Sequence, residues 1–306
     1  MATDAPSGRQ FEIAHGDQKA VIVGVGGGIR TYTHGGRDVL EPYPENKMCD
    51  GAHGKPLIPW PNRLEDGRYT FDGRPHQVDL SEPDKRNAIH GLLTWRGWQG
   101  ADHESDRVTM VIRLHPMAGY PFRVDAEITY SLGDDGLTVE TKLTNSGDKA
   151  CPVGAGQHPY LSPGAGASLN ECAVQLKAAT RILVDDERQL PVGTEPVEGT
   201  EFDLRTRRKV GDLQIDHGFR DLERDQDGRA WVHLTGPDGR TASLWAEKPY
   251  SIIQIYTGDT LAPKRQRHGL AAEPMTCPAN AFRSGEGVAR LVPGGKLVAR
   301  WGARLS

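Results

Sequence analysis

Apolar and polar residues alternate strictly over residues 122–132, where every second residue is apolar and the residues between are polar. This period of two is typical of a strand with one buried face. Residues 137–143 resume the period after a turn that contains Gly133 and Gly136. The two segments therefore predict an antiparallel β-hairpin.

Shorter versions of the same pattern recur along the chain. Hairpins are expected where residues 69–71 meet 78–80 and 231–235 meet 241–245, and further strands at 20–25, 108–114, 252–256 and 297–301. No window of about a dozen residues has a regular apolar period of about 3.6, so little helix is expected. Many short strands without intervening helices predict an all-β fold, a large antiparallel β-sandwich.

Composition adds limits on size and partners. The 306 residues include 37 Gly and 21 Pro, spread evenly, which favours frequent turns and a single domain over residues 1–306. Lys and Arg number 37 against 41 Asp and Glu, a formal net charge of −4, so no net positive field favours nucleic acid. No signal-peptide core and no apolar run of about 20 residues is found, which argues against a membrane partner.

The cysteines and histidines also bear on disulfides and metal sites. Four cysteines without CxxC spacing predict buried free thiols in a cytoplasmic protein. A monomer or homodimer is expected. The eleven histidines show no HxxxH or HxH spacing, so no metal is expected. The glycines between Gly24 and Gly28 are not followed by a helical pattern, and they predict a turn at a strand end rather than a nucleotide loop.

Several polar segments are candidates for a site, although each also has an ordinary structural interpretation. Asn62 and Arg63 precede a predicted strand, and His90 lies beside Gly91 near two tryptophans, Trp95 and Trp98. Taken alone, Asn62-Arg63 is more typical of a loop with a surface arginine, and core packing would explain the His90 segment equally well. His158 stands between flexible glycines and Pro159-Tyr160, a setting that presents a side chain at a fixed place.

Two carboxylates complete the candidate set. Glu273 lies in a largely uncharged stretch, where partial burial would raise its pKa and make it a useful base. Asp216 precedes His217-Gly218-Phe219, and the segment around Tyr256 ends a strand in polar groups that could face a ligand.

Taken together and in this order, these segments resemble the aldose 1-epimerase (galactose mutarotase) family from about residue 20 to the C-terminus. The motifs that carry the resemblance are Asn62-Arg63, His90-Gly91, His158-Pro159-Tyr160, Asp216, Tyr256-Thr257-Gly258, and Glu273-Pro274 with Asn280. The resemblance implies the same large β-sandwich. It also implies an enzyme that interconverts the α and β anomers of a free sugar without a cofactor.

The resemblance further assigns roles to individual residues. His158 would act as general acid and Glu273 as general base, on opposite sides of the anomeric centre. The monosaccharide would be held by Asn62, Arg63, His90, Asp216 and Tyr160. Unperturbed pKa values of about 6.5 for histidine and about 4.3 for glutamate predict a bell-shaped pH dependence, with the acidic limb from Glu273 and the basic limb from His158.

Other functions remain open from the sequence. A non-catalytic sugar-binding or sugar-sensing protein could use the same scaffold. Pro59-Trp60-Pro61 and Trp95-Arg96-Gly97-Trp98 are more similar to a bacterial branch that includes sulfoquinovose mutarotases. A sugar phosphate would require clustered cations, and the one dense basic run, residues 205–209, is typical of a solvated turn. Trp60, Trp95 or Trp98 could supply a platform for a sugar face.

Overall fold

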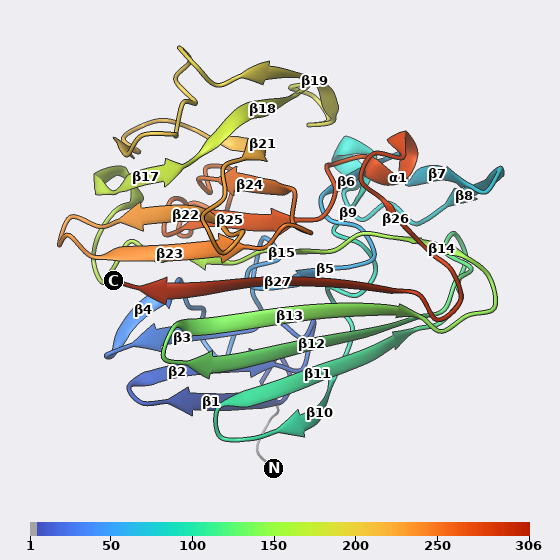
Figure 1. Cartoon of the computed structure of the whole chain (residues 1–306), viewed down its shortest axis with the longest axis horizontal. Coiled ribbons are helices and arrows are strands. Elements are labelled where there is room, and N and C mark those ends of the chain that lie inside the picture. The colour runs from blue at the N-terminus through green and yellow to red at the C-terminus, as the bar shows by residue number, and fades with distance from the viewer. Residues whose placement is uncertain (1–4) are drawn as a thin grey trace.

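The computed structural model describes residues 5–306, and it shows two large sheets stacked face to face (Figure 1). Within those residues the first sheet has 12 strands, in the order β1-β2-β3-β4-β16-β25-β24-β21-β18-β19, with β15 pairing with both β25 and β5. Its strands are β1 (Gln10–His15), β2 (Gln18–Val23), β3 (Ile29–His34), β4 (Arg37–Leu40), β5 (Pro56–Leu57), β15 (Gly156–Gln157), β16 (Tyr160–Leu161), β18 (Ala178–Val184), β19 (Pro191–Pro196), β21 (Asp216–Leu222), β24 (Ile252–Tyr256) and β25 (Leu270–Met275).

The second sheet has nine strands in the described chain, in the order β10-β11-β12-β13-β27-β23-β22-β17-β20. Its strands are β10 (Gln99–His103), β11 (Arg107–Leu114), β12 (Val124–Gly133), β13 (Gly136–Asn145), β17 (Ala173–Leu176), β20 (Arg208–Lys209), β22 (Ala230–Thr235), β23 (Thr241–Ala246) and β27 (Lys296–Leu305). Neighbouring strands in both sheets pair antiparallel. The predicted all-β fold with large antiparallel sheets is confirmed.

Three small strand pairs and three short helices complete the described residues. The pairs are β6 (Arg63–Glu65) with β9 (Asn87–Ile89), β7 (Arg68–Phe71) with β8 (Arg74–Gln77), and β14 (Cys151–Val153) with β26 (Ala289–Leu291). The helices are η1 (Pro83–Lys85), η2 (Leu169–Glu171) and α1 (Ala281–Ser284). None of the helices in residues 5–306 is long and apolar enough to cross a membrane.

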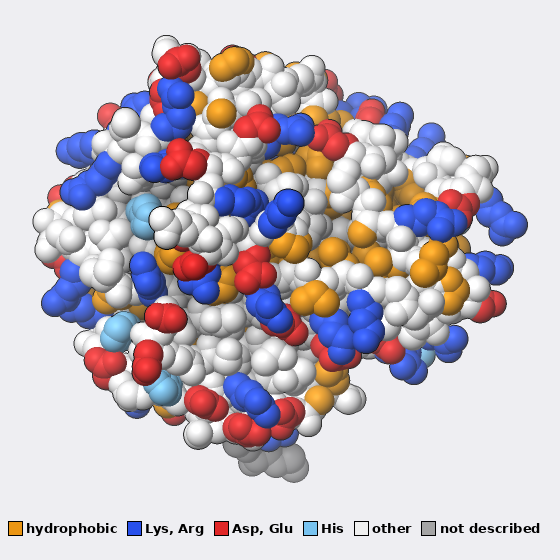
Figure 2. Space-filling model, viewed as in Figure 1, with side chains coloured by type: hydrophobic (Ala, Val, Ile, Leu, Met, Phe, Trp, Pro, Cys, Tyr) orange, Lys and Arg blue, Asp and Glu red, His pale blue; other side chains and the backbone are white. Residues whose placement is uncertain are grey.

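The core lies between the two sheets. Buried and half-buried residues alternate along β12 and β13, as their sequence pattern predicts. Strand β1 contacts β11 and β12, while β4 contacts β23 and β27, so the inward faces of both sheets share one apolar interior. On the face shown in Figure 2, acidic and basic side chains are interspersed over the surface.

Most predicted strands are confirmed within a few residues, but the prediction is wrong for the second strand of one hairpin. β12 and β13 form the predicted hairpin, and β24 spans the predicted residues 252–256. The partner of β7 is β8, which begins at Arg74 rather than at residue 78. A tight turn at Asp72-Gly73 brings Phe71 opposite Arg74, and the polar sequence of β8 gives no alternating signal.

The glycine-rich segment forms the predicted turn, which joins β2 to β3. Gly26 has a φ of +81°, and a Cβ there would lie 2.4 Å from the carbonyl oxygen of Thr94. The turn therefore packs directly against the segment that carries Trp95, which requires glycine. All four cysteines are buried free thiols, as expected.

Candidate active site

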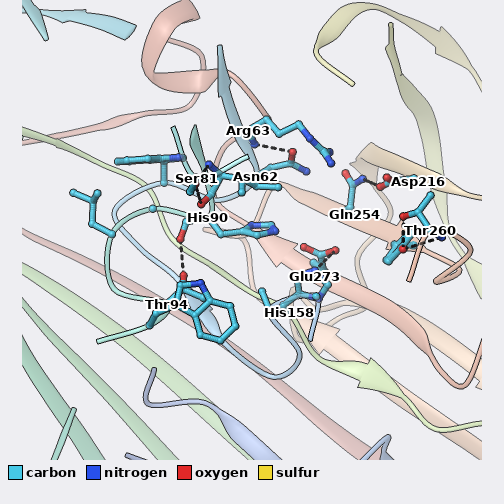
Figure 3. Close-up of a pocket in the computed structure, with 18 of the residues that line it drawn as sticks. Asn62, Arg63, Ser81, His90, Thr94, His158, Asp216, Gln254, Thr260 and Glu273 are labelled. Atoms are coloured by element: carbon cyan, nitrogen blue, oxygen red, sulfur yellow. Dashed lines mark hydrogen bonds and ion pairs between the residues drawn. The ribbon is translucent and has the colours of Figure 1, made fainter. Parts of the chain in front are cut away.

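A cavity of about 610 Å³ lies over strands β21, β24 and β25 and beside the segments that surround β6 and β9 (Figure 3). Six of the seven predicted site residues line it: Asn62, Arg63, His90, His158, Asp216 and Glu273. They come from places 27 to more than 200 residues apart in the sequence, so the fold alone brings them together. Tyr160 does not belong to the lining.

His158 and Glu273 lie side by side on one wall of the cavity. His158 Nε2 is 3.3 Å from Glu273 Oε1, and both side chains are almost fully buried. Glu273 is in β25, a strand buried along its whole length. The His158 segment is tied to it by a hydrogen bond from the Ala272 N–H to the Pro159 carbonyl. The expected placement on opposite sides of a substrate is therefore not what the structure shows.

Burial shifts both groups of this pair toward their neutral forms. Desolvation, and next the nearby Asp216 carboxylate, raise the pKa of Glu273 well above its usual value, while Arg63 opposes this. Desolvation, and then the neighbouring His53, lower the pKa of His158 to about 3. Both effects follow from the cost of holding a charge away from water. A buried carboxyl and imidazole in contact share one proton, and such a pair can act as general acid and general base.

The same pair has polar atoms without protein partners. Glu273 Oε2 and His158 Nδ1 are buried and make no hydrogen bond to any residue in the described chain. Buried polar atoms are nearly always paired in folded proteins. Glu273 Oε2 is therefore an acceptor free for a hydroxyl of a bound molecule.

Tyr160 and His53 stand behind His158 as a stack of rings. The Tyr160 ring is stacked on His158 at a centroid distance of 5.1 Å, and His53 is stacked on the other side of Tyr160 at 4.4 Å. His53 Nε2 bonds to the Glu41 carbonyl, and Arg265 faces His53 Nδ1 at 3.3 Å. Tyr160 thus supports the histidine instead of facing the cavity.

The β6–β9 pair brings the Asn62-Arg63 and His90 motifs together. Arg63 is opposite Ile89 in this pair, and the His90 N–H donates to the Asn62 carbonyl. The next residue, Gly91, has a φ of +73°, and a Cβ there would lie 2.1 Å from the Ile58 carbonyl oxygen. Only glycine fits this close backbone approach, which explains the His-Gly motif.

Arg63 is held in place by a carboxylate outside the predicted set. Its Nε and Nη2 donate to the two oxygens of Glu82, each at 2.9 Å. This two-point contact fixes the plane of the guanidinium. Within residues 5–306 the Arg63 Nη1 has no hydrogen-bond partner, and Arg63 lines the cavity. The sequence gives no signal for Glu82, because its strand-and-turn surroundings are ordinary.

Asp216 is held by two amides. Gln254 Nε2 donates to Asp216 Oδ1 at 2.7 Å, and Gln189 Nε2 donates to Oδ2 at 2.6 Å. Gln254 belongs to the strand end that the sequence expected to face a ligand, and it lines the cavity (Figure 3). Gln189 was not predicted.

The mouth of the cavity is aromatic and basic. Of the three candidate tryptophans, Trp60 and Trp95 line the cavity and Trp98 does not. Trp60 is buried, whereas Trp95 is 54% exposed and lies beside Arg96, a further lining residue. The basic run at 205–209 contributes nothing to this lining. Among the described residues no group of three His, Cys, Asp or Glu is arranged to hold a metal.

Comparison with known proteins identifies the family of this chain. The sequence model of the aldose 1-epimerase family matches residues 9–301. The chain belongs to the aldose 1-epimerase family. The resemblance inferred from the ordered motifs is therefore confirmed at the level of the family.

Two relatives place this aldose 1-epimerase family member more closely. It is 36% identical over 282 residues to the uncharacterised protein YihR of Escherichia coli K12, covering 91% of this chain and 87% of the relative. It is 29% identical over 219 residues to human galactose mutarotase, covering 65% of this chain and 60% of that protein.

Solved structures show the same fold at lower sequence identity. The GalM/aldose epimerase homologue from C. elegans matches with a TM-score of 0.85 at 19% identity, covering 97% of this chain and 98% of that one. Galactose 1-epimerase from Lactobacillus acidophilus NCFM matches with a TM-score of 0.79 at 19% identity, covering 96% and 92%. These likenesses establish the galactose mutarotase-like fold of the chain.

Proposed function

We propose that this protein is an aldose 1-epimerase that interconverts the α and β anomers of a free sugar through its open-chain form. The observation that carries the proposal is the contact of His158 with Glu273 in the cavity wall, 3.3 Å from Nε2 to Oε1. Both atoms that gain or lose a proton in ring opening, the ring oxygen and the anomeric hydroxyl, are bonded to C1. An acid and a base side by side can therefore reach both.

The reaction needs one proton delivered and one removed. Glu273 takes the proton of the C1 hydroxyl, and His158 gives a proton to the ring oxygen. The bond between C1 and the ring oxygen breaks while C1 and its own oxygen become a carbonyl. Rotation about C1–C2 presents the other carbonyl face, and the two groups exchange roles as the ring closes. Proton count and electron count are unchanged, so the residues alone complete the cycle.

Burial affects where the pair keeps its proton before substrate binds. Desolvation favours the protonated carboxyl of Glu273 and the neutral imidazole of His158. A sugar hydroxyl that donates to Glu273 would stabilise its carboxylate form. The proton can then pass to His158 across their contact, which gives the acid and base states that ring opening requires.

Polar residues around the His158–Glu273 pair hold the sugar in this proposal. Arg63, His90 and Asp216 bind hydroxyls. Asn62 fixes the start of β6, because its side-chain Oδ1 accepts a hydrogen bond from the Arg63 N–H at 2.8 Å. Charged donors and acceptors orient neighbouring hydroxyls well because their hydrogen bonds are short and directional. We assign Arg63, His90 and Asp216 to binding, Asn62 to positioning Arg63, and none of the four to proton transfer.

Anomer-exchange NMR tests the proposal directly. Exchange between α and β resonances is measured for glucose, galactose, xylose, arabinose and sulfoquinovose, with spontaneous mutarotation subtracted. We expect catalysed exchange for at least one sugar and none with a Glu273→Gln, His158→Asn double variant. Binding of a sugar without faster exchange would instead favour a sugar-binding protein on the same scaffold.

One observation favours a second candidate, a mutarotase for a sugar with an anionic substituent such as sulfoquinovose. Arg96 lines the cavity beside the exposed Trp95 and makes no ion pair or hydrogen bond through its side chain to any residue in 5–306. A cation available at the mouth would suit a sulfonate or phosphate at the far end of the sugar. If this candidate is correct, Arg96→Gln should slow exchange of sulfoquinovose and leave glucose unchanged.

A further inference from the structure

A short loop at residues 185–190, between β18 and β19, contacts the segment that leads from η1 into β9. Arg188 docks it there. Its Nε donates to the Lys85 carbonyl at 2.9 Å, and its Nη2 donates to the Arg86 carbonyl at 2.7 Å and to Asn87 Oδ1 at 3.1 Å. Arg188 also pairs with Asp66 at 3.0 Å. Lys85, Arg86 and Asn87 belong to the segment that carries β9, and Asp66 follows β6, so the loop joins the large sheet to the β6–β9 pair.

The conformation of the loop is set by its first residue. Asp185 Oδ1 accepts from the Arg188 N–H at 2.6 Å, and Asp185 Oδ2 accepts from the Leu190 N–H at 2.9 Å. Gln189, between them, has a φ of +55°. A non-glycine residue holds this left-handed conformation only where its surroundings enforce it. The conformation of the loop is therefore fixed by its own hydrogen bonds, and the Gln189 side chain extends from a fixed backbone.

Gln189 links that loop to Asp216. The Lys85 ammonium donates to Gln189 Oε1. Because an ammonium can only donate, this contact fixes which end of the amide is oxygen and which is nitrogen. Gln189 Nε2 consequently faces Asp216 Oδ2, at 2.6 Å. With Gln254 on Oδ1, each oxygen of the carboxylate accepts from one amide.

We infer that Gln189 is a positioning residue: it orients the Asp216 carboxylate so that the remaining lone pairs face the sugar. Gln189 does not line the large cavity; it borders a small one behind Asp216 and Arg63. It therefore acts through Asp216 without touching substrate. This inference rests on the proposed function, because it concerns how the enzyme binds its sugar.

Two substitutions of the same residue test the inference. Gln189→Met keeps the length of the side chain and removes its amide. We expect KM to rise about tenfold, the usual effect of losing a hydrogen bond to a charged group, with kcat changed less than about threefold. The sugar used is α-D-galactose, or the panel sugar that wild type converts fastest.

Gln189→Glu adds a second measurement, the pH dependence of KM, which a merely structural role would not change. The charged groups around Gln189 and its partner Lys85 are Asp216, Arg63, Glu82 and Asp185. An ionised carboxylate cannot donate to Asp216, whereas a protonated carboxyl can. The ratio of variant KM to wild-type KM should therefore fall as pH is lowered for Gln189→Glu and stay constant for Gln189→Met.

The control is Glu187→Gln in the same loop. The Glu187 side chain is 85% exposed and its one ion pair, with Arg86, spans 4.0 Å, so we expect wild-type KM and kcat. An unchanged KM in Gln189→Met would overturn the inference. So would a loss of kcat and thermal stability at constant KM, since that pattern would show a role in folding alone.

A measurement without turnover separates this inference from the proposed function. In protein labelled with ¹⁵N-glutamine, the side-chain amide signal of Gln189 is identified by its loss in Gln189→Met. We expect it to shift in Asp216→Asn and to stay in place in Glu187→Gln. An unmoved signal in Asp216→Asn would overturn the contact even in an active enzyme. Absence of anomer exchange in wild type would refute the proposed function whatever this signal does.

Discussion

The two walls of the cavity hold their side chains by different means. His158 and Glu273 are held by packing: a stack of rings stands behind the histidine, and a fully buried strand carries the glutamate. Arg63 and Asp216 are held by polar partners, Glu82 on one and two glutamine amides on the other. We call the surface of His158 and Glu273 the dry wall, because it is buried and leaves polar atoms unpaired. We call the surface of Arg63 and Asp216 the networked wall, because hydrogen bonds to other side chains hold both residues.

This difference fits the two tasks in the proposed reaction. A dry wall shifts pKa values toward neutral forms and leaves acceptors for substrate, which suits proton transfer. A networked wall fixes the direction of its charged groups, which suits binding of hydroxyls. Substitutions on the dry wall should therefore lower kcat/KM through the chemical step, and those on the networked wall should raise KM.

The largest effect is expected on the dry wall. Glu273→Gln and His158→Asn should each lower kcat/KM by at least about a hundredfold, because general acid or base catalysis contributes about 10²–10⁴-fold. Polarimetric initial rates, corrected for spontaneous mutarotation, measure the loss. Circular dichroism provides the control for folding. Near-wild-type rates in a folded Glu273→Gln protein would refute the proposed roles.

The pH dependence of the wild-type rate sharpens the same prediction. Activity requires one proton on the pair. Burial lowers the pKa of His158 to about 3 and raises that of Glu273. A second proton is therefore gained only near pH 3, by His158, and the single proton is lost above the raised pKa of Glu273. This reverses the limbs expected from unperturbed values, so kcat/KM should show a broad plateau with its basic limb from Glu273.

A smaller effect is expected on the networked wall. Asp216→Asn and Arg63→Ala should raise KM about tenfold with less change in kcat, because each removes a charged partner of a hydroxyl. Saturation kinetics of anomer exchange separate KM from kcat. Loss of kcat at unchanged KM in either variant would move that residue from binding to chemistry.

The same comparison explains what the sequence could predict. Strands such as β12 and β13 were predictable because burial on one face imposes a period of two. The six cavity residues were predicted from short motifs that together, and in their order, resemble the aldose 1-epimerase family; His158, between glycines and a proline, also stands in constrained backbone. Glu82 precedes Pro83 and His53 precedes Gly54, but neither belongs to one of these motifs, and Gln189 has no such neighbour. Gln189 meets Lys85 over 104 residues and Asp216 over 27, and only the folded chain reveals such pairings.

A still smaller effect is expected at Tyr160, the residue that supports the dry wall. The Tyr160 hydroxyl has no hydrogen-bond partner in residues 5–306, and its ring stacks on His158. Tyr160→Phe should therefore keep kcat/KM within about twofold of wild type. Tyr160→Leu removes the stacked ring, and should cost about 1–3 kcal/mol of stability and lower kcat. Thermal melts and rates measure both. A raised KM in Tyr160→Phe would instead indicate direct contact with the sugar.

The smallest effect concerns the stability that Glu273 contributes at different pH. Its pKa in the folded protein is raised above the usual value of 4.5, chiefly by desolvation. Above that value the unfolded chain releases the proton while the folded chain keeps it. The contribution of Glu273 is therefore fully present below about pH 4.5 and is lost as pH rises through the folded pKa.

Glu273→Gln removes this pH dependence. The melting temperature of the variant, relative to wild type, should rise with pH from about 4.5 upward and become constant above the folded pKa, by a few degrees in all. Other titrating groups are common to both proteins and cancel in the difference. Glu187→Gln, at an exposed carboxylate, should show no such trend. A difference in melting temperature that stays flat across this range would show that Glu273 is ionised in the folded protein, and the dry wall would then not shift its pKa.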